Sequence, residues 1–189
     1  AYEVGLPNQG VMILYEVLNE QDGVLAERTY SVWPDLEALM REHELPQFTV
    51  DGHRPVGAFD VFGLSFSTEL GYTNMLTALD LSRIPIHAAD RDESHPIVVA
   101  GGHAAFNPEP VADFIDVAVL GDGEQAVLLI TRIVRQWKSE GRPGGRGELL
   151  LRLAETGGLY VPALYDVDYL PDGRLRRVAP NDPRAPWRI

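Results

Sequence analysis

Two short apolar runs, each ended by glycine, constrain the fold of this chain more than any other feature. The runs are Ile97–Ala100 and Val117–Leu120, and they end at Gly101-Gly102 and at Gly121-Asp122-Gly123-Glu124. A buried strand followed by a glycine turn is how an open parallel sheet forms a crevice at its carboxyl edge. The short connection between the two runs predicts that the strands are neighbours, with a ligand site at their ends.

Strands and helices alternate along the chain, which predicts an α/β fold with a mostly parallel sheet and right-handed crossovers. The run VFGLSFS at Val61–Ser67 is apolar nearly throughout, so we expect it to be a central strand covered on both faces. A further strand is predicted at Val24–Tyr30. Helices are predicted at Val11–Asn19, from Pro34 onward, at Asn74–Leu81, at Gln125–Glu140 and at Leu149–Ala154.

The beginning of the chain departs from the usual order of a doubly wound domain. It opens on the turn Gly5–Gly10 and a helix, where such a domain opens on a strand. Because Tyr2–Val4 is too short for a central strand, we expect the first strand to lie upstream of this sequence. The sheet edge left open in that case favours a homodimer of the isolated chain.

The end of the chain predicts a β-hairpin. Tyr160–Tyr169 and Arg174–Val178 flank Pro171-Asp172-Gly173, a strong turn signal. We therefore divide the chain into an α/β domain, residues 1–158, and a hairpin with linker, residues 159–189.

The composition of the 189 residues excludes several classes of function. A net charge of −12 argues against nucleic-acid binding by this chain alone and against docking on an anionic membrane. With no cysteine, the chain has no disulfide, thiolate metal site or iron–sulfur cluster of its own. It also has no apolar run of the roughly 18 residues that a membrane span needs. These properties are compatible with a cytoplasmic protein.

Five segments, in this order, resemble the amino-terminal, cobalamin-binding-like domain of radical S-adenosylmethionine (SAM) proteins. They are YEVGLPNQGVMILYEVLN, LAERTYSVWPDLEALM, FDVFGLSFSTELGYTNMLTALDL, VVAGGHAAFNPEPVADFID and VLGDGEQAV. The resemblance covers about Tyr2 to Val178. It implies a flavodoxin-like, three-layer α/β/α fold of the cobalamin-binding type. It also implies a radical SAM domain downstream, which would carry a [4Fe–4S] cluster and S-adenosylmethionine.

One departure from the family pattern concerns the metal ligand. Cobalamin domains of the methyltransferase and mutase type carry an Asp-x-His-x-x-Gly loop whose histidine ligates cobalt. With Gly10 aligned on the last glycine, Gly5 stands at the Asp position and Pro7 at the His position. Either cobalamin binds here without a protein histidine ligand, or the domain has kept the fold and lost the cofactor. By resemblance, Ser65 or Ser67 and Gly101-Gly102 match the elements that surround the nucleotide tail of cobalamin.

The candidate cofactor-binding residues lie in four loops: Asn8, Gln9, Gly10, Ser65, Ser67, Gly101, Gly102, His103, Gly121, Asp122 and Gly123. Structural interpretations stand beside these. Asn8–Gly10 fit an ordinary N-cap turn, Ser67 or Thr68 a helix cap, and Gly101-Gly102 a tight strand exit with positive φ. A hydrogen-bonded loop histidine is the simpler interpretation of His103. The sequence indicates no catalytic residue and no metal ligand.

Three functions are consistent with these patterns. The first is a non-catalytic accessory domain of a radical SAM enzyme that binds a cobalamin-like cofactor or presents substrate. The second is a ligand-free structural or interaction domain that retains only the fold. The third, a free-standing hydrolase or nucleotide-binding enzyme, is disfavoured. Nothing resembling a nucleophile elbow surrounds Ser67 for a triad with His103 and Asp122, and Gly121–Glu124 does not complete a G-x-G-x-x-G loop.

Overall fold

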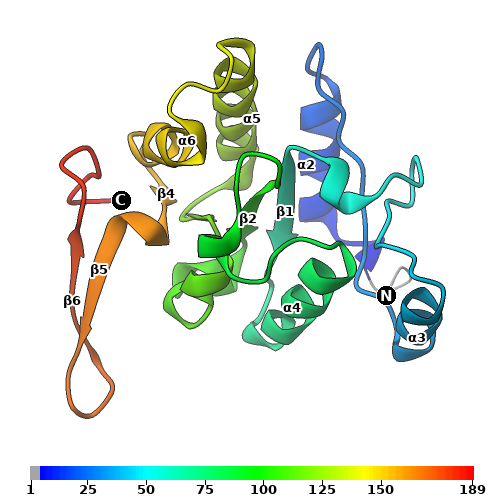
Figure 1. The fold of residues 1–189 in the computed structure, drawn as a ribbon, viewed down its shortest axis with the longest axis horizontal. Coiled ribbons are helices and arrows are strands. Elements are labelled where there is room, and N and C mark those ends of the chain that lie inside the picture. Colours follow the sequence, from blue (N-terminus) through cyan, green and yellow to red (C-terminus); the bar gives the residue numbers. More distant parts are fainter. Residues whose placement is uncertain (1–4) are drawn as a thin grey trace.

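The structure is a computed structural model and describes residues 5–189 (Figure 1). Within them, the main sheet has the strand order β1-β2-β3-β4, and β5 and β6 form a separate two-stranded sheet. The strands are β1 (Val61–Ser65), β2 (Ile97–Gly101), β3 (Val117–Val119), β4 (Leu159–Tyr160), β5 (Tyr165–Tyr169) and β6 (Leu175–Pro180). The α-helices are α2 (Gln9–Asn19), α3 (Pro34–Glu42), α4 (Tyr72–Leu81), α5 (Gly123–Ser139) and α6 (Gly145–Ala154).

The two glycine-ended runs form the neighbouring strands β2 and β3, as predicted. They run parallel, with Val99 of β2 opposite Val117 of β3. β1 lies parallel to β2 on the other side, with Ser65 opposite Gly101, and β4 pairs antiparallel with β3. The prediction of an α/β fold with a mostly parallel sheet is therefore confirmed, and the architecture is consistent with a flavodoxin-like fold.

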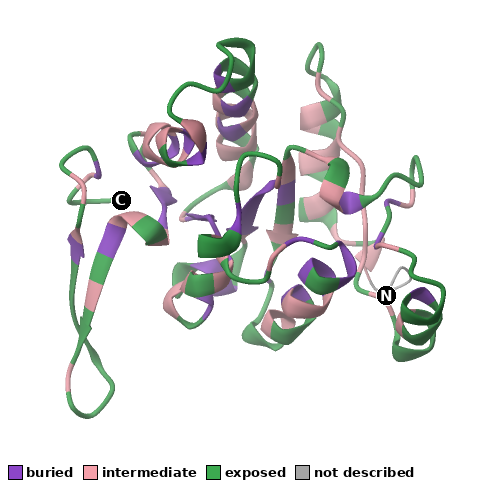
Figure 2. Ribbon diagram, viewed as in Figure 1, coloured by how far each residue is buried: buried purple, intermediate pink, exposed green. Residues whose placement is uncertain are grey.

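Helices cover both faces of the sheet. Successive side chains of a strand point to opposite faces, so the apolar strands present two apolar faces that the helices bury. One core cluster contains Phe62, Val98, Ala100 and Ala118, packed with the buried residues of α4 and of the 3₁₀ turns. The second cluster contains Ile97, Val99, Val117 and Val119, packed with α5 and α6. Figures 1 and 2 show the buried strands between these helical layers.

A buried ionic cluster fastens the start of β3 to α6. Asp116, which is 3% exposed, accepts hydrogen bonds from Arg91 Nη1 at 3.0 Å, from Arg146 Nη2 at 2.8 Å and from the Val98 N–H at 2.7 Å. Further guanidinium hydrogens go to backbone carbonyls, those of Pro85, Ile86 and Phe114 for Arg91 and of Asp92, His95 and Pro96 for Arg146. The buried Arg146 Nε makes no hydrogen bond within the described residues. Burial lowers the pKa of Arg91, and the Asp116 carboxylate opposes that shift. One carboxylate thus holds residues 85–96 and α6 against the sheet.

The predicted strand at Val24–Tyr30 is wrong. This segment has no regular secondary structure and pairs with no strand in the described residues. Side chains satisfy backbone groups that a ladder would otherwise bind. Asn19 Oδ1 accepts from the Ala26 N–H at 3.0 Å, and Asp51 Oδ2 from the Arg28 N–H at 2.7 Å. Such side-chain-to-backbone bonds compete with sheet formation and are not visible in an apolar pattern.

The expectation that the strand at Val61–Ser67 is covered on both faces is also wrong, whereas its central position depends on the upstream strand and stays a prediction. β1 ends at Ser65 and is the first strand of the described sheet, and both Gly63 and Ser65 are exposed. The face of β1 that carries Phe62 is buried, whereas the face of Gly63 and Ser65 is open. The run is uniformly apolar in sequence, but a glycine in place of a side chain leaves that face thinly covered.

At the end of the chain, the predicted hairpin is confirmed around the turn at Gly173, whose φ is 82°. The first predicted arm is divided, because Leu159–Tyr160 pair with β3 before Pro162 starts a 3₁₀ turn. The division of the chain at residue 158 stays a prediction. So does an upstream first strand, since Tyr2–Val4 lie outside the described residues.

Candidate functional site

The candidate site is the carboxyl edge of β1, β2 and β3. The register places Ser65, the last residue of β1, opposite Gly101, the last residue of β2. Gly63 lies on the same face of β1 as Ser65, two residues earlier. The structure therefore brings together two of the predicted elements, the serine at the end of β1 and the glycine turn after β2.

The backbone at this edge is open to solvent on one face. A Cβ atom built on Gly63, on Gly101 or on Gly121 would meet no other heavy atom within 4 Å. Packing therefore does not require glycine at positions 63 and 101. The absence of side chains leaves room in which a ligand can approach the strands, as glycine commonly does where backbone and ligand meet closely.

Gly102 has a structural role. Its φ of 95° is in the region that favours glycine, and a Cβ there would lie 2.5 Å from the Phe66 carbonyl oxygen. That oxygen accepts from the Ala104 N–H at 3.2 Å, and the Phe66 N–H donates to the Gly101 carbonyl at 2.8 Å. The tight strand exit predicted for Gly101-Gly102 is therefore confirmed at Gly102, where two strand ends are tied together.

Four polar side chains at the predicted site are exposed and make no hydrogen bond or ion pair within residues 5–189: Ser65, Ser67, His103 and Asp122. The interpretation of His103 as a hydrogen-bonded loop residue is consequently wrong. Neither side chain caps α4, because a 3₁₀ turn at Glu69–Gly71 separates Ser67 and Thr68 from that helix, and Thr68, the residue before the turn, makes no side-chain capping bond. Since no bond joins Ser67, His103 and Asp122, a hydrolytic triad is not assembled.

The loop before α2 is the fourth group of predicted site residues. Asn8 is the N-cap of α2, and its Oδ1 accepts from the Val11 N–H at 3.1 Å, so the N-cap interpretation is confirmed. Gln9 and Gly10 follow in the exposed first turn. α2 packs on α5, where a Cβ on Gly123 would lie 3.2 Å from Leu14 Cδ2. The first turn of α5 is therefore fixed beside α2.

The described residues hold no set of three histidine or acidic side chains that could bind a metal ion. The position of the missing histidine, Pro7, is exposed. Two hollows of about 300 Å³ each lie away from the glycine turns. One is lined by Trp137, Arg142 and Arg146 among others, and the second by Leu45 and Phe48 with neighbouring residues. The candidate site is therefore an open edge, where a ligand would be held at the surface.

Two tyrosines that the sequence did not identify hold the loop after β2 in place. Tyr72 Oη lies 3.0 Å from the carbonyl oxygen of Ala104 and 3.3 Å from that of Asn107, between which its one hydrogen is shared, and burial raises its pKa. Tyr160 Oη donates to Glu109 Oε1 at 2.6 Å. Burial, followed by the Glu109 carboxylate, raises the pKa of Tyr160 far above its ordinary value. The sequence could not identify these two tyrosines, because their hydrogen-bond acceptors lie far away in the chain.

The Tyr160–Glu109 bond predicts a pH dependence of stability. Because folding raises the pKa of Tyr160, its stabilising contribution is complete below the unfolded-state pKa near 10 and declines as the pH rises above that value. Tyr160→Phe is expected to lower the free energy of unfolding at pH 8 by about 1.5–3 kcal/mol, the usual range for a bond to a charged group. Urea denaturation from pH 8 to 11 should show the two proteins converging above pH 10. A constant difference would contradict the linkage.

Comparison with known proteins gives one match. The family model of the N-terminal region of radical SAM proteins matches residues 10–162. No curated protein and no solved structure matches the chain. In the part of the chain that the structure describes, no helix is both long enough and apolar enough to cross a membrane.

Proposed function

The chain belongs to the family of N-terminal regions of radical SAM proteins, and from this premise we propose that its open carboxyl edge binds a cobalamin-like ligand for the radical SAM domain. Family membership itself makes the chain an accessory N-terminal domain and implies a radical SAM domain downstream in the same protein. The [4Fe–4S] cluster and S-adenosylmethionine are expected in that downstream domain, which would carry out the reaction. We further propose that the protein is cytoplasmic.

The observation that carries the proposal is the open backbone at the ends of β1 and β2. A Cβ at Gly63 or Gly101 would meet no other atom within 4 Å, and Ser65, opposite Gly101 and two residues after Gly63, offers a free hydroxyl on the same face. In open α/β sheets, ligands bind outside the carboxyl ends of the strands. These residues fit the amide-rich periphery and tail of a cobalamin-like ligand. They do not fit coordination of its metal, because Pro7 replaces the histidine.

The alternative is a ligand-free structural or interaction domain that retains only the fold and shapes the mouth of the radical SAM domain. Two observations favour it: the missing imidazole at Pro7, and the location of both hollows away from the glycine turns. The outer edge of β1 pairs with no strand in the described residues. A homodimer of the isolated chain through that edge stays a prediction.

Titration of the full-length protein with hydroxocobalamin or methylcobalamin separates the two functions. We expect micromolar binding, seen as a change in the visible spectrum and as heat in calorimetry. Gly101→Ala is expected to weaken binding at least tenfold, because the new methyl group occupies the approach to the backbone. Gly147→Ala serves as the matched control, since its Cβ also meets nothing within 4 Å and lies in α6. Neither variant should lower the melting temperature appreciably, and Gly147→Ala should raise it slightly, because alanine favours a helix more than glycine does.

The contrary outcomes are distinct. No binding at high micromolar cobalamin would favour the ligand-free domain. Binding that Gly101→Ala leaves unchanged would place the ligand elsewhere on the protein. In that case Gly63→Ala, the second open position, tests whether any of the β1–β2 face is used.

A further inference from the structure

The β5–β6 hairpin has one apolar face and one charged face. In its register Val167 lies opposite Val178, and Tyr169 opposite Leu175, whereas Asp168 lies opposite Arg177. Side chains alternate along β5, so Val167 and Tyr169 share a face, and their partners in the antiparallel ladder share it with them. A register shift between the Asp168 and Tyr169 pairs leaves one extra residue in β6, so Leu175 stays opposite Tyr169 although it is three residues from Val178. We call the surface formed by Val167, Tyr169, Leu175 and Val178 the hairpin's apolar face.

This face is uncovered over the outer part of the hairpin. Tyr169 is 55% exposed, Leu175 48% and Val178 37%. At the base, by contrast, Tyr165 is buried, with its ring 5.1 Å from that of Tyr160. Figure 2 shows the hairpin projecting from the body with mostly exposed residues. A two-stranded hairpin is marginally stable by itself, so a projecting one with an apolar face gains stability by packing against another surface.

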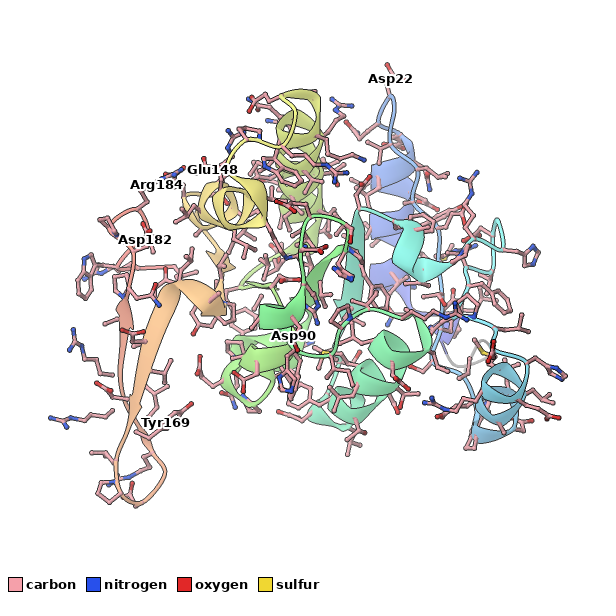
Figure 3. All side chains as sticks on the ribbon, in the orientation of Figure 1. Asp22, Asp90, Glu148, Tyr169, Asp182 and Arg184 are labelled. Carbon is pink, nitrogen blue, oxygen red and sulfur yellow. The ribbon has the colours of Figure 1, made fainter. Side chains whose placement is uncertain are left out.

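The hairpin and the chain that follows it are held in a fixed orientation. Tyr169 Oη donates to Glu109 Oε2 at 3.3 Å, which ties the outer part of β5 to the body. After β6, Arg184 forms ion pairs of 2.7 Å with Glu148 of α6 and with Glu155 (Figure 3). These contacts connect both the hairpin and the chain after it to the body of the domain. They therefore fix the orientation of the hairpin's apolar face relative to the main sheet.

The path of the chain indicates what covers the face. Tyr165 Oη donates to the Pro186 carbonyl at 2.8 Å, so the chain returns to the base of the hairpin after β6. Trp187 follows and is 75% exposed. The radical SAM domain implied by the family lies downstream of this point. A domain tethered so close has a high effective concentration at the hairpin, so a modest contact area is sufficient for docking.

We propose that the hairpin's apolar face is the docking surface for the downstream radical SAM domain. The contact sets the orientation of the carboxyl edge of the main sheet relative to the domain that performs the chemistry. This role is independent of any ligand at that edge. It requires only that the apolar side chains of the hairpin be covered in the whole protein.

Hydroxyl-radical footprinting of the full-length protein tests the proposal, with the oxidation of Tyr169 as the readout. In the wild type, we expect Tyr169 to be oxidised several-fold more slowly than a tyrosine side chain that is 55% exposed, as Tyr169 is in this structure. Leu175→Glu, which places a charge on the apolar face, is expected to raise the rate several-fold. Arg177→Glu introduces the same residue on the opposite face and should leave the rate unchanged. Val178→Asn is a milder second variant, and circular dichroism checks that each protein is folded.

The proposal is overturned if wild-type Tyr169 is oxidised as fast as in Leu175→Glu, which would show a face that is never covered. Protection that disappears on dilution from dimer to monomer would also overturn it, because the covering surface would then be a second copy of the chain. Cobalamin titration of the same variants separates this result from the ligand proposal. A variant can lose the protection of Tyr169 and still bind cobalamin, and the absence of cobalamin binding leaves the docking result unaffected.

Discussion

Asp116→Ala is expected to lower the free energy of unfolding by about 3–5 kcal/mol, the range seen when one partner of a buried ion pair is removed. The substitution leaves the guanidinium groups of Arg91 and Arg146 without their carboxylate in an environment that excludes water. It also removes the acceptor of the Val98 N–H. Equilibrium denaturation in urea, followed by circular dichroism, measures the loss.

Asp60→Ala provides the control for this variant. Asp60 forms an ion pair of similar length with Lys138, 2.6 Å, but both side chains are substantially exposed. Exposed pairs contribute about 0.2–1 kcal/mol, so the control should be barely destabilised. Equal losses from the two substitutions would show that the buried cluster does not carry the stability assigned to it.

Gly102→Ala has the second largest expected effect. Alanine at a φ of 95° is strained by about 1–3 kcal/mol, and its Cβ would lie 2.5 Å from the Phe66 carbonyl, so the two strand ends must move apart. We expect a loss of at least this size in the free energy of unfolding. Loop movement should also increase amide hydrogen exchange at Ala104, whose N–H is bonded to Phe66.

The neighbouring Gly101→Ala is the matched comparison for stability. Its Cβ meets nothing within 4 Å and its φ is not in the left-handed region, so the stability should change by less than about 1 kcal/mol. The two variants would thus show that the fold requires glycine at position 102, whereas at position 101 the glycine only leaves space above the backbone. If both variants were equally destabilised, the space above Gly101 would not be free.

The sequence predicted the centre of this fold better than its edges. The β2 and β3 runs are uniformly apolar and end in glycine, so burial and turn chemistry both indicate their class and place. The long stripe of α5 predicted that helix to within two residues at its start and one at its end. In both cases local pattern and tertiary packing agree, and the prediction needs no distant contact.

The errors arose where distant side chains decide the structure. Side chains of Asn19 and Asp51 accept hydrogen bonds from backbone N–H groups of Val24–Tyr30. The segment therefore does not form a strand, although its residues favour one. At the site, the sequence placed Ser65 and Gly101 in one crevice without predicting that they stand opposite each other, and it wrongly gave His103 a hydrogen-bond partner. The role of Glu109 as acceptor for Tyr160 joins residues far apart in the chain, which no spacing rule reveals.

The free polar side chains at the carboxyl edge have a consequence for how such a domain can change over time. Because the exposed side chains of Ser65, Ser67, His103 and Asp122 make no hydrogen bond or ion pair within residues 5–189, substituting them removes no such contact from the described fold. The stability resides elsewhere, in the Asp116 cluster and the two core layers. Mutational drift can therefore alter what the edge binds, or abolish binding, while the scaffold stays folded.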